Sequence, residues 1–229
     1  MKKFSFLTIL LCLSVSLAYA QKSRTPVKLI KPQTIQTATA VEIPEAEWQN
    51  LTAALKAEMW EKSALLAAQY LQKIKIENDK KQLAQLRYFY LYALAGKILA
   101  LSNANRTLAE NAAWQELDKA VSAFAGKEFV LPPRRFLPEC REVLNYICPV
   151  KDNERALRVT ATNQAGTAIH SFDYVAFENV ISINRFLDQE IFLGGKFKRA
   201  EFNQDMSKPW VMRLIFEKGF VNLVGKNNK

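Results

Sequence analysis

The chain has little of what catalytic and metal sites are most often built from. Its 229 residues include three cysteines, seven glycines and a single histidine, His170. One histidine excludes a histidine-rich metal site and leaves one candidate base for a Ser-His-Asp arrangement. Because residues 169–172 have the pattern of a strand, we expect this histidine to be structural. No glycine-rich phosphate loop is present either, so the sequence predicts no enzyme, no cofactor and no metal.

Long apolar runs are also scarce, and the main one stands at the amino terminus. Residues 1–20 consist of two early lysines, an uncharged apolar run and an Ala-Tyr-Ala end. This pattern is typical of a Sec-type signal peptide. The run is shorter than the ~20 residues that span a bilayer. We therefore expect a periplasmic chain that begins at Gln21 and has no transmembrane span, with a surface or secreted location as the alternative.

Two cysteines, Cys140 and Cys148, follow the predicted signal peptide. In an oxidising envelope compartment an even pair predicts a disulfide. The alternative is two separate thiols, which one continuous helix through both positions would favour. Pro138 and Pro149 argue against such a helix, so the sequence favours the disulfide.

Basic residues outnumber acidic ones. The formal net charge is +10, from 32 Lys and Arg against 22 Asp and Glu. Residues 21–44 carry four Lys and Arg among Thr, Gln and Pro and predict an extended basic tether, and residues 226–229 form a polar tail. A basic tail can bind an anionic glycan or lipid headgroup, although most such tails are only solvated. Nucleic acid is disfavoured as a partner because an exported protein seldom meets it.

Residues 45–126 are the one long segment whose apolar side chains recur at a helical period. The pattern predicts four helices in two antiparallel hairpins. The expected boundaries are a first helix from 45 to a turn at 58–60, a second to about 77, a third over 81–101, and a fourth over 107–124 that begins with a capping box of Thr107 and Glu110.

Part of this segment resembles the tetratricopeptide repeat (TPR). Trp48, Leu51 and Ala64 stand at the spacing at which a Trp and a Leu of one helix meet a small Ala of the next. Thr52 and Ala68 depart from the usual Gly and aromatic residue. The resemblance covers about a third of the chain and implies a TPR-like scaffold of the kind that binds other proteins. A plain four-helix bundle is the alternative.

The second half of the chain has a different pattern. Four prolines within residues 127–150 predict a junction between domains, with one short helix near 139–146. Residues 151–225 then alternate apolar and polar, which predicts a small β domain. The expected strands are 156–162, 169–177, a short one at 179–183, 190–202 with a bend at Gly194 and Gly195, and a hairpin with strands 210–216 and 221–223 around a turn at Lys218 and Gly219. The predicted fold is thus α+β, with helical hairpins followed by a small antiparallel sheet or an OB-like barrel.

Two functions are compatible with these features. The first is a non-enzymatic adaptor or scaffold of the cell envelope, part of a secretion, motility or surface assembly, whose helices bind an envelope protein. For this contact the sequence favours Arg87, Tyr88 and Tyr92, since Tyr and Arg are common at binding hot spots.

The second function is polyanion or glycan binding. Lys196, Lys198 and Arg199 lie beside Phe197 on one predicted strand, which would place charge on one face and a ring on the other. A half-buried strand with no binding role has the same pattern.

Overall fold

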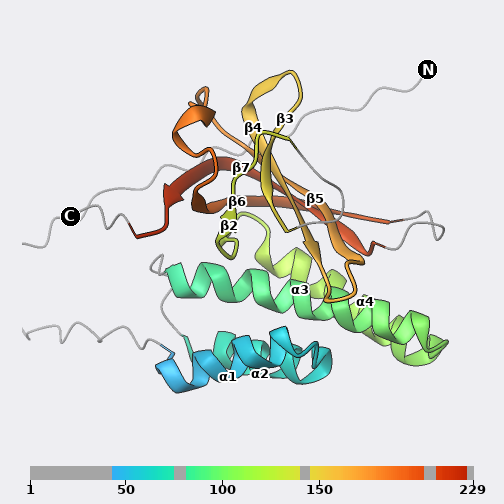
Figure 1. Ribbon diagram of the computed structural model, residues 1–229. Helices are drawn as coiled ribbons and strands as arrows, with labels where there is room; N and C mark the ends of the chain where they lie inside the picture. The colour runs from blue at the N-terminus through green and yellow to red at the C-terminus, as the bar shows by residue number, and fades with distance from the viewer. Residues whose placement is uncertain (1–42, 75–80, 140–144, 204–209, 226–229) are drawn as a thin grey trace, which may run out of the picture. The chain divides into compact units, whose positions relative to one another are not determined.

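The structure is a computed structural model that describes residues 43–74, 81–139, 145–203 and 210–225. All of these lie in one compact unit, which spans Thr39–Lys229. Four helices are followed by a sheet of seven strands, so the predicted α+β class is confirmed (Figure 1). The elements are α1 (Glu45–Lys56), α2 (Trp60–Lys73), α3 (Lys81–Asn103), α4 (Thr107–Phe124), β1 (Glu128–Val130), β2 (Arg134–Arg135), β3 (Ile147–Val150), β4 (Asn153–Thr162), β5 (Ala168–Ala176), β6 (Glu190–Phe202) and β7 (Met212–Leu223), with a 3-10 helix at Ile183–Arg185.

The four expected helices are present, with corrections at their ends. The turn between α1 and α2 falls at 57–59, close to the prediction, and α2 ends earlier, at Lys73. The capping box is wrong because Thr107 is already the first helical residue, and Arg106 stands at the cap without a side-chain hydrogen bond. Hairpins of this kind are compatible with the TPR resemblance, which stays a prediction.

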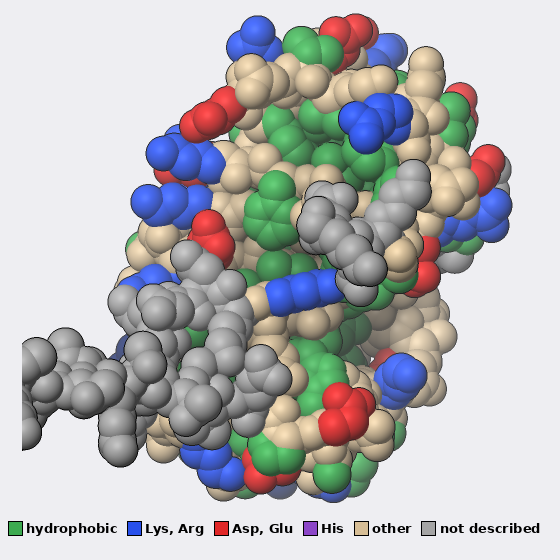
Figure 2. Space-filling view, turned by 90° about the vertical axis from the view of Figure 1, so that its left-hand side faces the viewer, with side chains coloured by type: hydrophobic (Ala, Val, Ile, Leu, Met, Phe, Trp, Pro, Cys, Tyr) green, Lys and Arg blue, Asp and Glu red, His purple; other side chains and the backbone are tan. Residues whose placement is uncertain are grey.

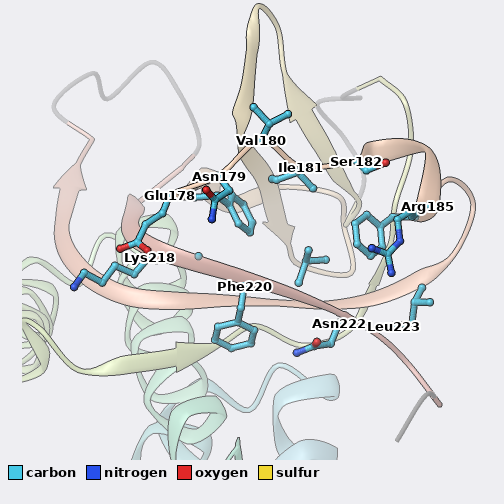
Figure 3. A pocket seen from close by; sticks show the side chains of 14 residues that line it. Glu178, Asn179, Val180, Ile181, Ser182, Arg185, Lys218, Phe220, Asn222 and Leu223 are labelled. Atoms are coloured by element: carbon cyan, nitrogen blue, oxygen red, sulfur yellow. The ribbon is translucent and has the colours of Figure 1, made fainter. Parts of the chain in front are cut away.

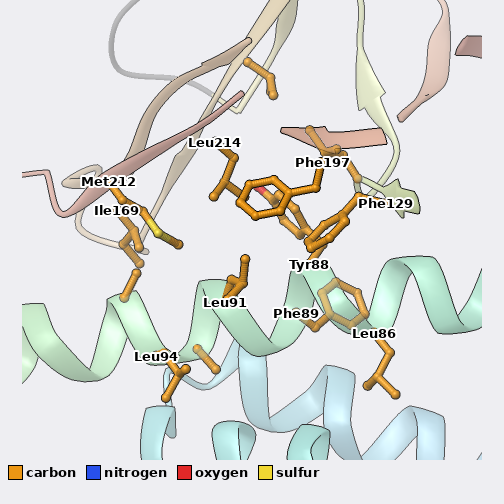
Figure 4. Packing of buried hydrophobic residues seen from close by; sticks show 14 of the residues in the cluster. Leu86, Tyr88, Phe89, Leu91, Leu94, Phe129, Ile169, Phe197, Met212 and Leu214 are labelled. Carbon is orange, nitrogen blue, oxygen red and sulfur yellow. The ribbon is translucent and has the colours of Figure 1, made fainter. Parts of the chain in front are cut away.

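The third helix, α3, is the centre of the fold because it is covered on two sides. It packs on α2 and α4 and also on β1 and β5. Figure 4 shows Leu91 pointing toward Leu214 of the sheet, and Leu94 pointing toward the first two helices. A close contact with α2 depends on Gly96, because a Cβ there would lie 2.5 Å from the ring of Trp60.

The segment expected to be a junction between domains is part of the shared core. Strands β1, β2 and β3 all come from residues 127–150, and Phe129 and Phe136 are fully buried. Of the short helix expected near 139–146, residues 140–144 lie outside the described part. The helices and the sheet are therefore not separate domains, because one hydrophobic cluster includes residues of both.

The sheet is mixed, with parallel and antiparallel pairs among its described strands. Its order is β1-β6-β7-β5-β4-β3, with β2 also paired to β6. The pair β5 and β7 is parallel, which corrects the expectation of an all-antiparallel sheet. One further contact links the two ends of this order: a parallel bridge joins Phe136, directly after β2, to Ile147 of β3, and the Leu137 N–H donates to the Ile147 carbonyl at 2.8 Å. Because β2 pairs with β6, this bridge connects β3 back to β6, and the OB-like form of the barrel stays a prediction.

Two details of the strand prediction are wrong. Residues 179–183 are not a strand; they lead into the 3-10 helix. The expected final hairpin is one continuous strand, β7. Lys218 has the left-handed conformation of a turn residue, with φ 50°, but here it forms a bulge opposite β6. The strand bends there and continues instead of turning back.

The predicted signal peptide, most of the tether and the polar tail lie outside the described residues. No helix in the described part of the chain is long and apolar enough to cross a membrane.

Candidate functional site

The face of the sheet that points away from α3 carries a row of aligned side chains. Asp173 of β5 points toward the helices, because its carboxylate accepts a hydrogen bond from the Tyr88 hydroxyl, so the next residue, Tyr174, points the other way. The strand register then continues the row: Arg158 pairs with Tyr174, Tyr174 with Ile215, and Ile215 with Arg199. Directly paired residues lie on the same face of a sheet. We call this face the open face.

A groove of about 450 Å³ crosses the open face. It combines basic side chains with two aromatic rings. The residues that define it are Arg158, Lys198, Arg199, Arg213, Glu201, Glu217, Phe172, Tyr174 and Ile215. Four cations against two carboxylates leave the groove with an excess of two positive charges.

Acidic residues hold several of these cations in place. The ion pairs are Lys198 with Glu217 at 3.5 Å, Arg199 with Glu201 at 2.6 Å, and Arg213 with Glu201 at 3.6 Å. These side chains are between 37% and 54% exposed, so water screens each pair and each contributes little to stability. The cations thus stay in reach of an incoming anion.

The aromatic residues of the groove are positioned by local contacts. The guanidinium of Arg158 lies over the ring of Phe172, 4.9 Å from its centroid. The Tyr174 hydroxyl accepts a hydrogen bond from Asn153 at 3.0 Å. Both rings are half-buried, so each keeps part of its surface toward the groove.

The structure brings together two of the three cations predicted for polyanion binding. Lys198 and Arg199 line the groove, whereas Lys196 lies outside its lining. Phe197 is buried on the opposite face, as the alternation predicted.

Sequence reasoning missed two further cations, Arg158 and Arg213, and the two rings. Arg158 and Arg213 alternate with apolar residues in their strands, and this signal was available.

The residues predicted for partner binding are mostly taken up by packing, although Tyr88 and Tyr92 also line a small pocket of about 230 Å³. Arg87 and Tyr88 are buried, and Tyr92 is half-buried between α3 and the sheet. Arg87 donates to the carbonyl of Glu128 at 2.8 Å, and the Tyr92 hydroxyl donates to the carbonyl of Thr162 at 2.9 Å. These side chains join the helices to the sheet, which corrects the prediction.

His170 belongs to a buried polar cluster and not to a cleft. It is fully buried on β5, with Nδ1 2.9 Å from Asp173 Oδ2 and the rings of Tyr88 and Tyr92 packed edge-on against it. Asp173 also accepts the backbone N–H of Leu214 at 2.7 Å. This geometry agrees with the structural role expected for the histidine.

The tyrosines of α3 should make the fold sensitive to alkali. Burial raises the pKa of Tyr92 to about 12, with Arg134 opposing and Glu58 adding to the shift, and burial also raises the pKa values of Tyr88 and Tyr90. In the unfolded chain these groups ionise near pH 10. The folded state then binds more protons between pH 10 and 12, so the free energy of unfolding falls as pH rises through this range.

We expect Tyr92→Phe to make this alkaline fall shallower, because the variant keeps the ring and loses one ionising group. At neutral pH it should cost about 1 kcal/mol for the lost hydrogen bond. Urea unfolding at pH 8, 10 and 11 measures both effects. An unchanged difference between pH 8 and pH 11 in the variant would contradict the prediction.

Cys148, on β3, is disulfide-bonded, and it is the one cysteine within the described residues. Its predicted partner Cys140 lies outside them, so the pairing itself stays a prediction.

Within the described part of the chain, no three His, Cys, Asp or Glu side chains lie together as metal ligands do. The groove of the open face combines basic and aromatic side chains. Comparison with protein-family models, curated proteins and solved structures finds no match to this chain.

Proposed function

We propose that this protein is an exported, non-enzymatic binding protein of the cell envelope that holds an anionic glycan in the groove of the open face. The observation that supports this best is the row of Arg158, Tyr174, Ile215 and Arg199, which four different strands bring together on one face. The predicted signal peptide supplies the envelope location.

The chemistry of the groove favours an acidic sugar polymer over a small anion. The four cations are spread over three strands, β4, β6 and β7, and not focused on one point, which suits charges repeated along a chain. Phe172 and Tyr174 offer ring faces to the apolar faces of sugar rings. Ion pairs with Glu201 and Glu217 pre-orient the cations, which lowers the entropy lost on binding.

Heparin, used as a model anionic glycan, tests the proposal. We expect the double variant Lys198→Gln with Arg199→Gln to weaken heparin binding about tenfold, because two charge-assisted contacts are lost. Isothermal titration calorimetry at low ionic strength measures the affinity. The binding of the unchanged protein should weaken as salt is added, since the cations are half-exposed.

The matched control is Lys62→Gln with Lys119→Gln. Both lysines are exposed, on α2 and α4, and the double change alters the net charge by the same amount. Equal weakening by the two double variants would mean that the overall charge, and not the groove, attracts heparin. That result would overturn the proposal.

An adaptor role is the second candidate. Because Arg87, Tyr88 and Tyr92 are taken up by packing, an adaptor needs another surface. The observation in its favour is a second and larger cleft, beside the carboxyl-terminal part of β7.

A further inference from the structure

The carboxyl-terminal part of β7 has a neighbouring strand on one side only. The parallel pairing with β5 reaches Val175 and Phe216 and then stops. β5 ends at Ala176, and the next amide, that of Phe177, donates to Arg155 of β4 instead. After the bulge at Lys218, residues 220–223 pair with β6 alone, so within the described chain their other edge has no strand beside it.

The backbone groups on this edge can be assigned. The N–H of Val224 donates to the carbonyl of Glu190 at 3.0 Å. Hydrogen-bonded pairs alternate along an antiparallel ladder, so Asn222 also bonds to β6, while Val221 and Leu223 direct their N–H and C=O groups to the other side. The carbonyl of Leu193 supports this assignment, because it accepts a hydrogen bond from the N–H of Leu131 and thus points away from β7.

A cleft of about 740 Å³ adjoins this edge. One wall is residues 218–223, and the other is the segment 177–186 that follows β5. Figure 3 shows Lys218 and Glu178 near one end of the cleft and Arg185 near the other, with Val180 and Ile181 between them. The side of the molecule on which β7 ends faces the viewer in Figure 2, where hydrophobic side chains lie exposed among acidic and basic ones.

The charges of the cleft indicate the chemistry of its occupant. Arg185 is exposed and forms no ion pair with any described residue; its guanidinium lies 6.0 Å from the ring centroid of Phe186. An acidic side chain would fit beside it. The apolar side chains between the two ends would fit residues of the same kind at every second position, which is the spacing of an extended strand.

We propose that this cleft binds an extended segment of a partner protein by strand addition to the free edge of β7. The segment forms backbone hydrogen bonds with Val221 and Leu223, places apolar side chains on Val180 and Ile181, and carries an acidic residue beside Arg185. Strand addition is a common way in which a sheet edge recognises a peptide, with affinity from the backbone and specificity from alternate side chains. The proposal is independent of glycan binding on the open face.

Amide hydrogen exchange tests whether the edge is free. In the chain without its predicted signal peptide, we expect the amides of Val221 and Leu223 to exchange on the order of 100-fold faster than that of Asn222. Equal protection of the three amides in the absence of any partner would mean that the chain itself covers the edge, which would overturn the proposal.

A displayed library of random octapeptides supplies the probe for binding. Selection should enrich peptides with β-branched residues at every second position and an acidic residue at one end. A synthetic copy of the best peptide should slow the amide hydrogen exchange of Val221 and Leu223. No enrichment, or a peptide that protects other amides, would overturn the proposal.

Two variants then locate the contact. Val221→Pro removes an N–H that points into the cleft and leaves the ladder with β6 intact, so it should weaken the selected peptide about tenfold. Its matched control, Val221→Ala, shortens the same side chain and keeps the N–H, and it should weaken binding much less. Arg185→Glu, which changes an exposed side chain, should also weaken binding about tenfold and provides a test if the proline variant fails to fold. Unchanged affinity in both Val221→Pro and Arg185→Glu would refute the site, whereas neither should alter heparin binding.

Discussion

Replacing Phe129 by alanine is expected to lower the free energy of unfolding by about 3 to 5 kcal/mol, the usual cost of removing a buried phenylalanine. Phe129 is fully buried on β1. Its ring lies 5.2 Å from that of Phe197, 5.5 Å from that of Phe216 and 5.9 Å from that of Phe124. Phe129, on β1, therefore packs against α4, β6 and β7. Alanine would leave a cavity between these elements that could be filled only if they moved.

Urea unfolding followed by circular dichroism measures this change. Leu108→Ala is the control, because Leu108 is 88% exposed and its loss should change the free energy of unfolding very little. The comparison tests whether residues 127–150 belong to the hydrophobic core or form a linker. If they were a linker between domains, Phe129→Ala would cost no more than the control.

The linker prediction failed for a physical reason. Proline is excluded from central strands but is accepted at sheet edges, and β1, β2 and β3 lie at or near the two edges of this sheet. A proline-rich stretch can therefore alternate between short edge strands and turns and still bury Phe129 and Phe136. Proline content by itself does not separate a linker from a sheet edge.

The helices and long strands were predictable because their periodicity reflects burial directly. β6 has the bounds that the alternation predicted, 190–202. The course of the final strand was not predictable, because the local sequence Lys218-Gly219 suits a turn and a bulge equally well. Pairing with β6, which lies far away in the sequence, selects the bulge.

The site was only half predictable for a similar reason. In a regular strand, His170, Phe172 and Tyr174 would all share one face. Phe172 has φ 55°, and the register of β5 shifts between His170 and Tyr174. The extra residue turns His170 toward the helices and Tyr174 toward the groove. The alternating sequence pattern cannot reveal that β5 supplies both His170 of the buried cluster and Tyr174 of the groove.

The same irregularity brings His170 and Asp173 to one face, and Asp173→Ala should therefore be among the most damaging changes, at about 3 to 5 kcal/mol of unfolding free energy. Asp173 is fully buried and has contacts to Leu214 N–H, the Tyr88 hydroxyl and His170 Nδ1. Removing the carboxylate leaves these polar groups in the core without a partner, and each unsatisfied group costs about 1 to 3 kcal/mol.

Asp118→Ala is the matched control, because the same side chain is removed from an exposed position on α4, and it should change the free energy of unfolding by less than about 1 kcal/mol. Asp173→Asn should fall between the two, since the amide oxygen can still accept the Leu214 N–H. Urea unfolding of the three variants gives the order. If Asp173→Ala cost no more than Asp118→Ala, water would have to replace the lost carboxylate. The space between α3 and β5 could then not be a sealed core that fixes His170 and Tyr88 and the bulge that turns Tyr174 toward the groove.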